Sequence, residues 1–396
     1  MPDAPQFGIR GENVVCFAGE DWWYHHPHSK NHIMRRFARE NKVLFVNSLS
    51  MGLPSVSNPD YWMKIRRKLA SYVRWLRKVE SGLWVLSPIM IPSYRNSWIR
   101  TINRLLVHFQ VHIAMMIAGM SNPIVWVAIP SAADVAISMR KKALVYQISD
   151  KYNANEDSSL EVSIINDWDR KLKEISSHVF YSGRKLFAES AKVHNRYFLE
   201  QAVDFEHFSQ ENVLSAPEVA NIKHPVLFYM GAMDHVMDTA LVADVAQRKP
   251  QWNFVFVGLR SNSVQVNASN VHFLGPQPYH KLPQFLAHAD VCILPWRVEN
   301  IFTSYGSAIK VREYLASGKP VVIAPLYEYL DTPGLRIYQG VEQFIAQVEN
   351  ALAENEDQVH SHDQKEFRRL QVKDHTWDIR TREVGKMLLA DLTPEK

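Results

Sequence analysis

Short runs of apolar residues recur along the chain, and the longer segments between them carry apolar residues at helical spacing. Alternating strand and helix patterns of this kind predict parallel sheets whose strands are joined by crossover helices. In the first half, the runs that predict strands are residues 14–18, 43–46, 83–86, 124–127, 144–146 and 178–181. In the second half they are residues 226–229, 253–257, 271–273, 291–294, 320–323 and 335–338. The pattern predicts two doubly wound α/β units.

Two domains are also expected from the length, because 396 residues exceed what one hydrophobic core usually supports. Residues 209–225 are polar and lack periodicity, which is typical of an interdomain connection. We therefore expect a first Rossmann-like domain over residues 1–208, a linker over 209–225 and a second Rossmann-like domain over 226–372. Residues 373–396 should form a last helix that packs back on the first domain.

The composition is that of a folded globular protein, with 46% hydrophobic and 22% charged residues. Cys16 and Cys292 both lie in apolar runs expected to be buried strands, so neither a disulfide framework nor a cysteine metal site is expected. The first residues lack the layout of a signal peptide, and the longest apolar stretch, around residues 113–120, is far shorter than the roughly 18 residues of a membrane span. We expect a protein of the reducing cytoplasm.

Positive charge is concentrated in residues 61–110, although the formal net charge of the chain is only +4. The one acid in this segment is Glu80, and its basic residues are Lys64, Arg66, Arg67, Lys68, Arg74, Arg77, Lys78, Arg95, Arg100 and Arg104. Residues 61–78 and 98–106 place tryptophans and cations at helical spacing, which is the composition of an interfacial helix attracted to anionic lipid. The alternatives are an ordinary helix that packs its apolar residues inward and a nucleic-acid surface. We favour peripheral membrane contact through residues 61–110.

Glycine follows two of the predicted strands in the second half. The first strand leads into Gly231, Asp234 and then a helix, and the second leads into a glycine and Arg260. A glycine at that place lets the backbone approach a diphosphate, which a helix N-terminus also favours. The alternative is that the glycines serve packing and that Arg260 faces solvent.

Three motifs in this half carry a resemblance: NVHFLG at residues 270–275, YHKLPQFLAHADVCILP at 279–295 and KVREYLASGKPVV at 310–322. They resemble the C-terminal half of GT-B fold glycosyltransferases of the family 4-like type, and more narrowly the bacterial teichuronic acid biosynthesis glycosyltransferases. The resemblance implies two Rossmann-like domains that face a central cleft. It also implies that the second domain holds a nucleotide diphosphate sugar and that the first holds the acceptor.

The resemblance implies roles for individual residues as well. The turn from Gly275 through Gln277 to Tyr279 would border the base, Glu313 would accept hydrogen bonds from the ribose hydroxyls, and Lys310 would contact the diphosphate. The chemistry agrees, because a carboxylate accepts from a vicinal diol and an ammonium neutralises a departing diphosphate. The alternative is a solvated first-turn acid at Glu313 and a surface cation at Lys310.

One position departs from the family pattern. Many retaining GT-B enzymes carry a second glutamate eight residues before the one that matches Glu313, and this chain has Tyr305 there. Support for a retaining mechanism is weaker as a result, and the stereochemistry stays open. Candidates for the missing contacts to the phosphates and the sugar are Thr303, Ser304, Ser307 and Arg297.

The loop after the first predicted strand, residues 18–30, is rich in aromatic and imidazole side chains. It should lie at the carboxyl edge of the first sheet, where ligands of such sheets bind. Its candidate acceptor-binding residues are Asp21, Trp22, His25, His26 and His28. Three nearby histidines suit zinc, but no further ligand cluster in the sequence completes a site, so we expect sugar contacts and no metal.

Asp150 follows the strand predicted over residues 144–146. The stretch from Leu144 to Asp150 is similar to one in the xanthan-pathway glucuronosyltransferase family, in which the aspartate is the catalytic base of an inverting reaction. The resemblance implies that Asp150 would deprotonate the acceptor hydroxyl that attacks the anomeric carbon. The alternative is an N-cap for the helix that follows.

The sequence as a whole predicts a glycosyltransferase of bacterial surface polysaccharide synthesis that needs no further cofactor. It would move a sugar from a nucleotide diphosphate sugar, expected to be a UDP-sugar, to a saccharide or a polyprenyl-linked saccharide. The expected location is the inner face of the cytoplasmic membrane. Two alternatives remain: a nucleotide-sugar 2-epimerase on the same fold, and a non-catalytic scaffold that binds membrane or nucleic acid.

Overall fold

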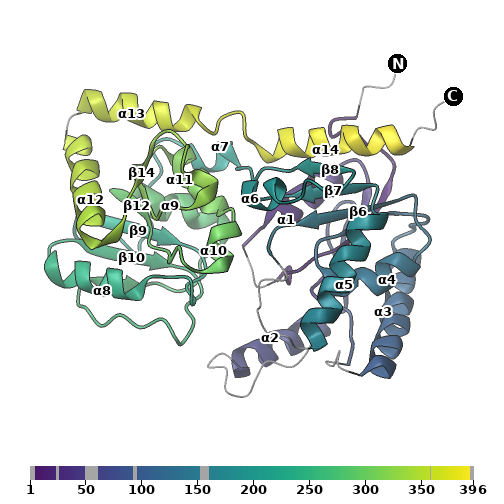
Figure 1. Cartoon of the computed structure of the whole chain (residues 1–396). Helices are drawn as coiled ribbons and strands as arrows, with labels where there is room; N and C mark the ends of the chain where they lie inside the picture. Colours follow the sequence, from purple (N-terminus) through teal and green to yellow (C-terminus); the bar gives the residue numbers. More distant parts are fainter. Residues whose placement is uncertain are drawn as a thin grey trace. The chain divides into compact units, whose positions relative to one another are not determined.

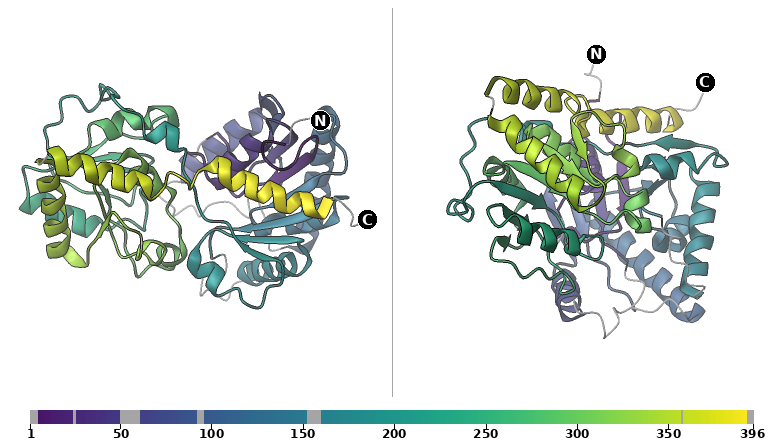
Figure 2. Two further views of the ribbon diagram at one scale, coloured as in Figure 1. Left: turned by 90° about the horizontal axis from the view of Figure 1, so that it is seen from above. Right: turned by 60° about the vertical axis from the view of Figure 1, so that its left-hand side comes forward.

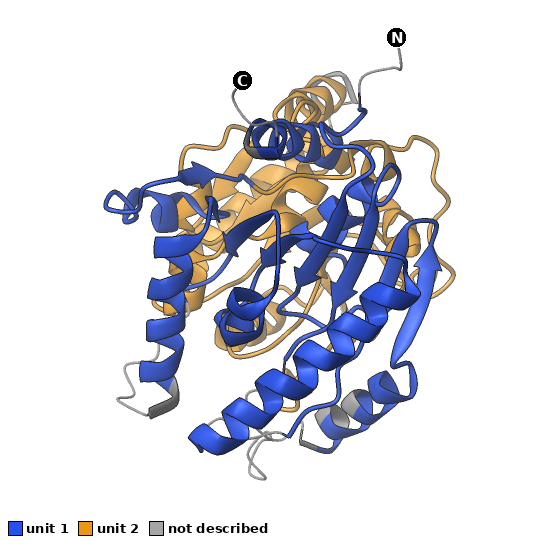
Figure 3. Cartoon of the chain, turned by 90° about the vertical axis from the view of Figure 1, so that its right-hand side faces the viewer, with its two compact units in different colours: residues 1–200, 377–396 blue, residues 201–376 orange. Residues whose placement is uncertain are grey.

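The computed structural model (Figure 1 and Figure 2) describes residues 5–23, 26–49, 61–91, 96–151, 160–356 and 358–392. The chain divides into two compact units, which Figure 3 draws in blue and orange. Unit 1 is Met1–Glu200 with Trp377–Lys396, and unit 2 is Gln201–Thr376. Each unit is built on its own largely parallel sheet, so the predicted fold class of two doubly wound α/β units is confirmed.

Unit 1 has an eight-stranded sheet in the order β3-β4-β2-β1-β5-β6-β7-β8. Its strands are β1 (Asn13–Phe17), β2 (Lys42–Val46), β3 (Leu76–Glu80), β4 (Leu83–Leu86), β5 (Ile124–Val127), β6 (Ala143–Ile148), β7 (His178–Tyr181) and β8 (Arg196–Phe198). Its helices are α1 (Ser29–Phe37), α2 (Tyr61–Val73), α3 (Ser97–Ile117), η1 (Pro130–Ala132), α4 (Ala133–Ser138), α5 (Leu160–Ile175), α6 (Arg184–Ala188) and α14 (Trp377–Leu392). All neighbouring strands are parallel except β3 and β4. Because the chain builds outward from β1 on one side and from β5 on the other, the switch point lies between these two strands.

The edge strand β3 corrects the expectation of one helix over residues 61–78. Helix α2 ends at Val73, and the next residues pair antiparallel with β4. Only Leu76 and Val79 of this strand are half-buried, while the charged residues between and beside them are exposed. An edge strand with one solvated face needs no continuous apolar run, so the apolar pattern did not reveal it.

The first and last helices of unit 1 pack together although they come from opposite ends of the chain. Helix α14, yellow in Figure 2, lies against α1. The imidazole of His32 stacks on the fully buried indole of Trp377 with ring centroids 4.8 Å apart. Arg36 Nε donates to Asp378 Oδ1 at 2.5 Å. An aromatic stacking contact and an ion pair thus hold the last helix on unit 1.

Unit 2 has a six-stranded, all-parallel sheet in the order β11-β10-β9-β12-β13-β14. Its strands are β9 (Val226–Met230), β10 (Asn253–Val257), β11 (Val271–Phe273), β12 (Val291–Leu294), β13 (Val321–Ile323) and β14 (Leu335–Ile337). Its helices are α7 (Phe205–Phe208), α8 (Thr239–Arg248), η2 (Tyr279–Lys281), α9 (Leu282–Ala287), α10 (Ile301–Tyr305), α11 (Ile309–Ser317), η3 (Tyr327–Tyr329), α12 (Gly340–Glu356) and α13 (Gln358–Leu370). The chain moves from β9 to one side and then restarts at β12 on the other. The switch point of unit 2 therefore lies between β9 and β12.

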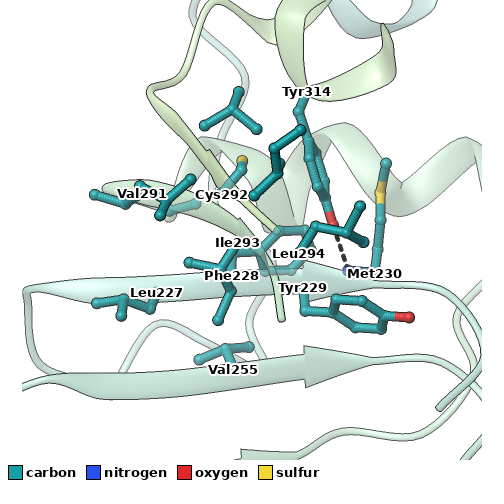
Figure 4. Close-up of a cluster of buried hydrophobic side chains, with 14 of the residues drawn as sticks. Leu227, Phe228, Tyr229, Met230, Val255, Val291, Cys292, Ile293, Leu294 and Tyr314 are labelled. Atoms are coloured by element: carbon teal, nitrogen blue, oxygen red, sulfur yellow. Dashed lines mark hydrogen bonds between the residues drawn. The ribbon is translucent and has the colours of Figure 1, made fainter. Parts of the chain in front are cut away.

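The core of unit 2 fixes α11 against the end of β9 (Figure 4). Every residue of β9 and β12 is buried, as expected for central strands of a covered parallel sheet. The buried Tyr314 of α11 accepts a hydrogen bond from the Met230 backbone N–H at 2.8 Å. Burial also raises the pKa of Cys292 in β12 to about 12, which leaves its thiol unreactive. Helix α11 is thus positioned where β9 ends.

Among the residues that the structure describes, no helix combines the length and the apolar character that crossing a membrane requires.

Candidate functional site

The switch point of unit 2 is shaped by two glycines at strand ends. Gly231, directly after β9, has a φ of 124°, and a Cβ there would lie 2.4 Å from Lys310 Nζ. Gly258, directly after β10, has a φ of 148°, and a Cβ there would lie 2.0 Å from the Gly231 carbonyl oxygen. Residues that carry a side chain rarely adopt these φ angles. Glycine at both positions therefore lets the Lys310 ammonium approach the backbone after β9, and lets the backbone after β10 approach that after β9.

Lys310 holds its ammonium over the switch point. Its Nζ donates to Tyr229 Oη at 3.0 Å and lies 4.5 Å from the Tyr229 ring centroid and 4.8 Å from that of Trp296. Tyr229 is the next-to-last residue of β9 and Trp296 follows the end of β12 by two residues, so one ring comes from each side of the switch point. An ammonium has three N–H donors, which leaves it able to serve a further acceptor. Lys310 is therefore not the solvated surface cation of the alternative interpretation, because its ammonium lies close to two aromatic rings.

Glu313 lies about one turn after Lys310 on α11, and its side chain is buried. Its Oε1 lies 3.3 Å from Tyr279 Oη, and Asp204 Oδ2 lies at the same distance from that hydroxyl. A phenol has one proton, so it donates to one of the two carboxyl groups at a time. Burial raises the pKa of Glu313 to about 8; the charge of Asp204 adds to this rise, while Lys310 and Tyr279 oppose it. A solvated first-turn acid is therefore excluded at this position.

Tyr279 is held in place by a neighbouring helix. The His207 ring stacks on the Tyr279 ring with centroids 5.0 Å apart, and His207 Nε2 lies 3.1 Å from the Tyr279 carbonyl oxygen. Partial burial, followed by the charges of Glu313 and Asp204, raises the pKa of Tyr279 well above its usual value. The phenol therefore stays a hydrogen-bond donor between the two carboxyl groups. The structure thus brings together Gly231, Lys310, Glu313 and Tyr279 of the predicted donor residues.

Three other predicted donor residues lie in local contacts around the ends of β9 to β11. Asp234 Oδ1 accepts from the Val236 backbone N–H at 3.1 Å. The Arg260 guanidinium lies 4.4 Å from the Phe273 ring centroid. Gln277 Nε2 donates to a backbone carbonyl within its own turn at 3.3 Å.

The hydroxyl residues of the loop after β12 are also engaged. Thr303 is buried, and its Oγ1 donates to the Arg297 carbonyl oxygen at 2.5 Å. Ser304 Oγ donates to the Ile301 carbonyl oxygen at 3.0 Å. Ser307 Oγ lies 3.5 Å from a tyrosine hydroxyl of η3. Arg297 is exposed, whereas Ser304 and Ser307 are half-buried.

In unit 1, Asp150 lies beyond the carboxyl end of β6 and near an ion pair between the buried Lys30 and the half-buried Glu20. Lys30 is buried in α1, and its Nζ donates to Glu20 Oε1 at 2.5 Å. Burial lowers the pKa of Lys30, but the carboxylate of Glu20 more than offsets this, and the net shift is upward. Asp150 is an exposed residue, but the packing of neighbouring groups around its carboxyl group raises its pKa; Lys30 opposes the rise and Glu20 adds to it. A carboxylate whose proton affinity is raised is suited to take a proton.

The predicted acceptor loop folds onto unit 1 through its own polar groups. Asp21 accepts from the Trp23 backbone N–H at 3.0 Å and from Ser71 Oγ at 2.5 Å. The Trp22 backbone N–H donates to Asn47 Oδ1 at 2.9 Å. These contacts fix the backbone on which the loop presents its rings.

The histidines of this loop are spread along it. His26 is half-buried and His28 is the exposed N-cap of α1, whereas His25 lies outside the described residues. Within the described ranges, no group of three or more His, Cys, Asp and Glu side chains could hold a metal ion.

Six residues of these two clusters were not among the predicted site residues: Tyr229, Trp296, Asp204, His207, Glu20 and Lys30. Tyr229 belongs to an apolar strand run, and Asp204 lies 75 residues before the tyrosine that it contacts. Trp296 could have been found, because it follows the end of a predicted strand by two residues.

Comparison with known proteins bears on the fold of the chain and on unit 2 in particular. Residues 224–354, most of unit 2, match the family model described as glycosyl transferases group 1. The chain has the fold of a sucrose-phosphate synthase from Thermosynechococcus elongatus, with a TM-score of 0.69 and 11% identity over 96% of this chain and 98% of that one. It likewise has the fold of Anabaena HepE, solved in complex with UDP, with a TM-score of 0.60 and 13% identity over 96% and 100% of the two chains. The fold is therefore that of the GT-B glycosyltransferases.

One relative is closer in sequence than these structures. The chain is 28% identical over 217 residues to a Bacillus subtilis (strain 168) protein named teichuronic acid biosynthesis glycosyltransferase TuaH. The alignment covers 51% of this chain and 52% of that protein, so the chain spans about half the length of the curated relative it matches. The resemblance that the three motifs indicated is confirmed by these matches.

Proposed function

We propose that this protein is a glycosyltransferase that uses a nucleotide diphosphate sugar. The observation that carries the proposal is the pairing on α11 of an ammonium held at the switch point with a buried carboxyl group one turn further on. A diphosphate requires a cation and a ribose diol requires an acceptor, and Lys310 and Glu313 supply both. The family match over residues 224–354 and the GT-B fold support the proposal.

In the proposed donor complex, Lys310 binds the diphosphate and stabilises it as it departs. Glu313 accepts from the ribose hydroxyls, and the turn through Gln277 to Tyr279 borders the base. Gly231 lets the diphosphate approach the backbone after β9. UDP is the nucleotide we propose, because the similar Anabaena structure contains it.

Further donor contacts are proposed for polar residues around the same strand ends. Arg297 has the exposed cation that could reach the sugar or a phosphate. The remaining candidates are Asp234, Arg260, Thr303, Ser304 and Ser307.

For the transfer step, we propose that Asp150 takes the proton of the acceptor hydroxyl. The freed oxygen then bonds to the anomeric carbon, the bond from that carbon to the diphosphate oxygen breaks, and the electron pair leaves with the nucleoside diphosphate. Lys310 neutralises the charge that develops on this leaving group. The raised pKa of Asp150 supports its role as proton acceptor.

The acceptor we propose is a saccharide or a lipid-linked saccharide of surface polysaccharide synthesis, handled at the inner face of the cytoplasmic membrane. The name of the Bacillus subtilis relative supports the pathway class. The basic segment 61–110 supports the membrane location. The loop after β1 would contact the saccharide through Asp21, Trp22, His25, His26 and His28.

Calorimetric titration with UDP, GDP and ADP tests the donor site. We expect saturable binding of at least one of them, weakened about tenfold or more by Lys310→Ala or Glu313→Ala, since each removes a charge-assisted contact. The controls are Lys223→Ala and Glu218→Ala, which alter exposed residues of unit 2 and should bind like the wild type. If none of the three nucleotides binds, the proposal is wrong.

A further inference from the structure

The outward face of α3 in unit 1 is apolar. Trp98, Ile102, Leu105 and Phe109 are 78%, 49%, 61% and 62% exposed, and their spacing puts them on one side of the helix. Met116 extends the same stripe. The opposite side of α3 is the one that is buried against the unit. Figure 3 views unit 1 from the side on which α3 lies.

The chain after β4 enlarges this surface and is clamped to α3. Asn103 accepts from the Ile91 backbone N–H at 2.8 Å and donates to the Ile91 carbonyl oxygen at 2.7 Å. Gln110 accepts from the Ile89 backbone N–H at 2.9 Å and donates to the Ile89 carbonyl oxygen at 2.7 Å. The exposed side chains of Ile89 and Ile91 are thereby held beside the helix.

Helix α2 repeats the pattern with cations added. Trp62, Leu69 and Val73 are exposed at the spacing of one helix face, and the exposed Arg66 falls on the same face. Further exposed cations of unit 1 in this part of the chain are Arg74, Arg77, Lys78 and Arg104.

A surface helix normally turns polar residues to water, so an apolar outer stripe on α3 indicates a partner. A nucleic acid would match the cations but would leave the apolar stripe in water. A second copy of the chain would cover the stripe but would bring its own cations against these ones. An anionic bilayer matches both features, because its headgroups attract Lys and Arg while its interface accepts Trp, Leu and Phe.

We propose that α3 docks unit 1 on an anionic membrane surface, with Trp98, Leu105 and Phe109 inserted at the boundary between headgroups and acyl chains. The cations of α2 and β3 then bind the headgroups. This inference rests on the proposed function in one respect, because it identifies the surface that brings the enzyme to a lipid-linked acceptor.

Vesicle flotation tests the docking face. We use phosphatidylcholine vesicles with and without phosphatidylglycerol, and compare the wild type with a Trp98→Ser, Phe109→Ser double variant. We expect the wild type to float with the anionic vesicles and the double variant to bind about tenfold or more weakly, since two large apolar side chains no longer insert. The control is Leu214→Ser in unit 2, which removes an apolar side chain that is 86% exposed and should bind like the wild type.

An environment-sensitive fluorophore on Phe109→Cys reports insertion itself. Both native cysteines are fully buried, so the label is directed to the new thiol. We expect a blue shift with anionic vesicles, and no shift for the same label on Leu214→Cys.

Three outcomes would overturn the inference: no flotation of the wild type, equal flotation of the double variant, or dimerisation through α3 in place of vesicle binding. UDP titration of the same variants separates this failure from that of the proposed function, because docking variants should retain nucleotide binding. If the wild type binds UDP but does not bind the vesicles, the inference alone fails; if it binds the vesicles but not UDP, the proposed function alone fails.

Discussion

Binding of a nucleoside diphosphate should release a proton from Glu313. In the free protein, burial raises the pKa of Glu313 to about 8, and the charge of Asp204 contributes to this rise. The side chain is therefore mostly a neutral acid at pH 7. Ribose hydroxyls that donate to it favour the carboxylate, so binding lowers its pKa and expels the proton.

The size of the effect follows from that pKa. With a pKa of about 8, about nine in ten molecules carry the proton at pH 7, so binding should release about 0.9 proton. Because the free state holds the proton and the bound state does not, affinity rises with pH. It should increase about tenfold per pH unit between roughly pH 6 and pH 7 and level off above roughly pH 8.

Calorimetry in two buffers of different ionisation enthalpy measures the number of protons released. Glu313→Gln should lose this release and bind UDP more weakly, leaving only the contribution of the phosphate groups of the nucleotide. Asp204→Asn should still bind UDP but should release fewer protons at pH 7. The reason is that this variant lacks a negative charge that raises the pKa of Glu313. Glu218→Gln, at an exposed position, should match the wild type.

Equal proton release by the wild type and Glu313→Gln, with both binding UDP, would refute the reasoning. Glu313 would then be ionised before binding or would lie away from the ribose. Unchanged release in Asp204→Asn would refute only the coupling through Tyr279.

Three further predictions concern catalysis and stability. Asp150→Asn should slow transfer about 100-fold or more and leave UDP affinity unchanged, because it removes a general base alone; unchanged turnover in a nucleotide-release assay would return Asp150 to helix capping. Glu354→Ala should lower the free energy of unfolding by about 3–5 kcal/mol, because Glu354 and Arg368 form a buried ion pair 2.7 Å apart. Urea unfolding measures this, with Glu349→Ala at an exposed position as the control. Equal urea midpoints for the two variants would contradict the prediction. Gly258→Ala should lower the melting temperature by several degrees, because its Cβ would lie 2.0 Å from a backbone carbonyl oxygen. Gly340→Ala should lower the melting temperature less, because Gly340 also has a positive φ but a Cβ there would meet open space. Equal shifts in melting temperature would rule out the steric cause.

The fold could be predicted because central strands of parallel sheets are buried on both faces. Each of the twelve predicted apolar runs overlaps a strand of the structure. The strands β3 and β8 lie at the two edges of the unit 1 sheet and were missed, whereas the edge strands β11 and β14 of unit 2 were found although their residues are also only half-buried. The apolar pattern therefore reveals the centre of a sheet better than its edges.

The candidate site could be predicted only in part. Lys310 and Glu313 lie in one motif on one helix, so their spacing shows in the sequence. Their partners do not, because Tyr229 and Asp204 come from segments brought beside α11 only by the sheet order and by α7. Asp204 in particular resembles a structural aspartate until its contact with Tyr279 is seen. The network that sets the pKa of Glu313 is thus a property of the fold.

Transfer of a labelled sugar tests the central claim most directly. The protein is incubated with a panel of radiolabelled nucleotide diphosphate sugars and with vesicles that contain polyprenyl-linked saccharides, and the label in the lipid phase is counted. We expect label to move to the lipid phase with at least one donor, and to stay in the aqueous phase for Lys310→Ala and Asp150→Asn. Recovery of all the label as unchanged or epimerised nucleotide sugar with the wild-type protein would contradict the proposed glycosyl transfer.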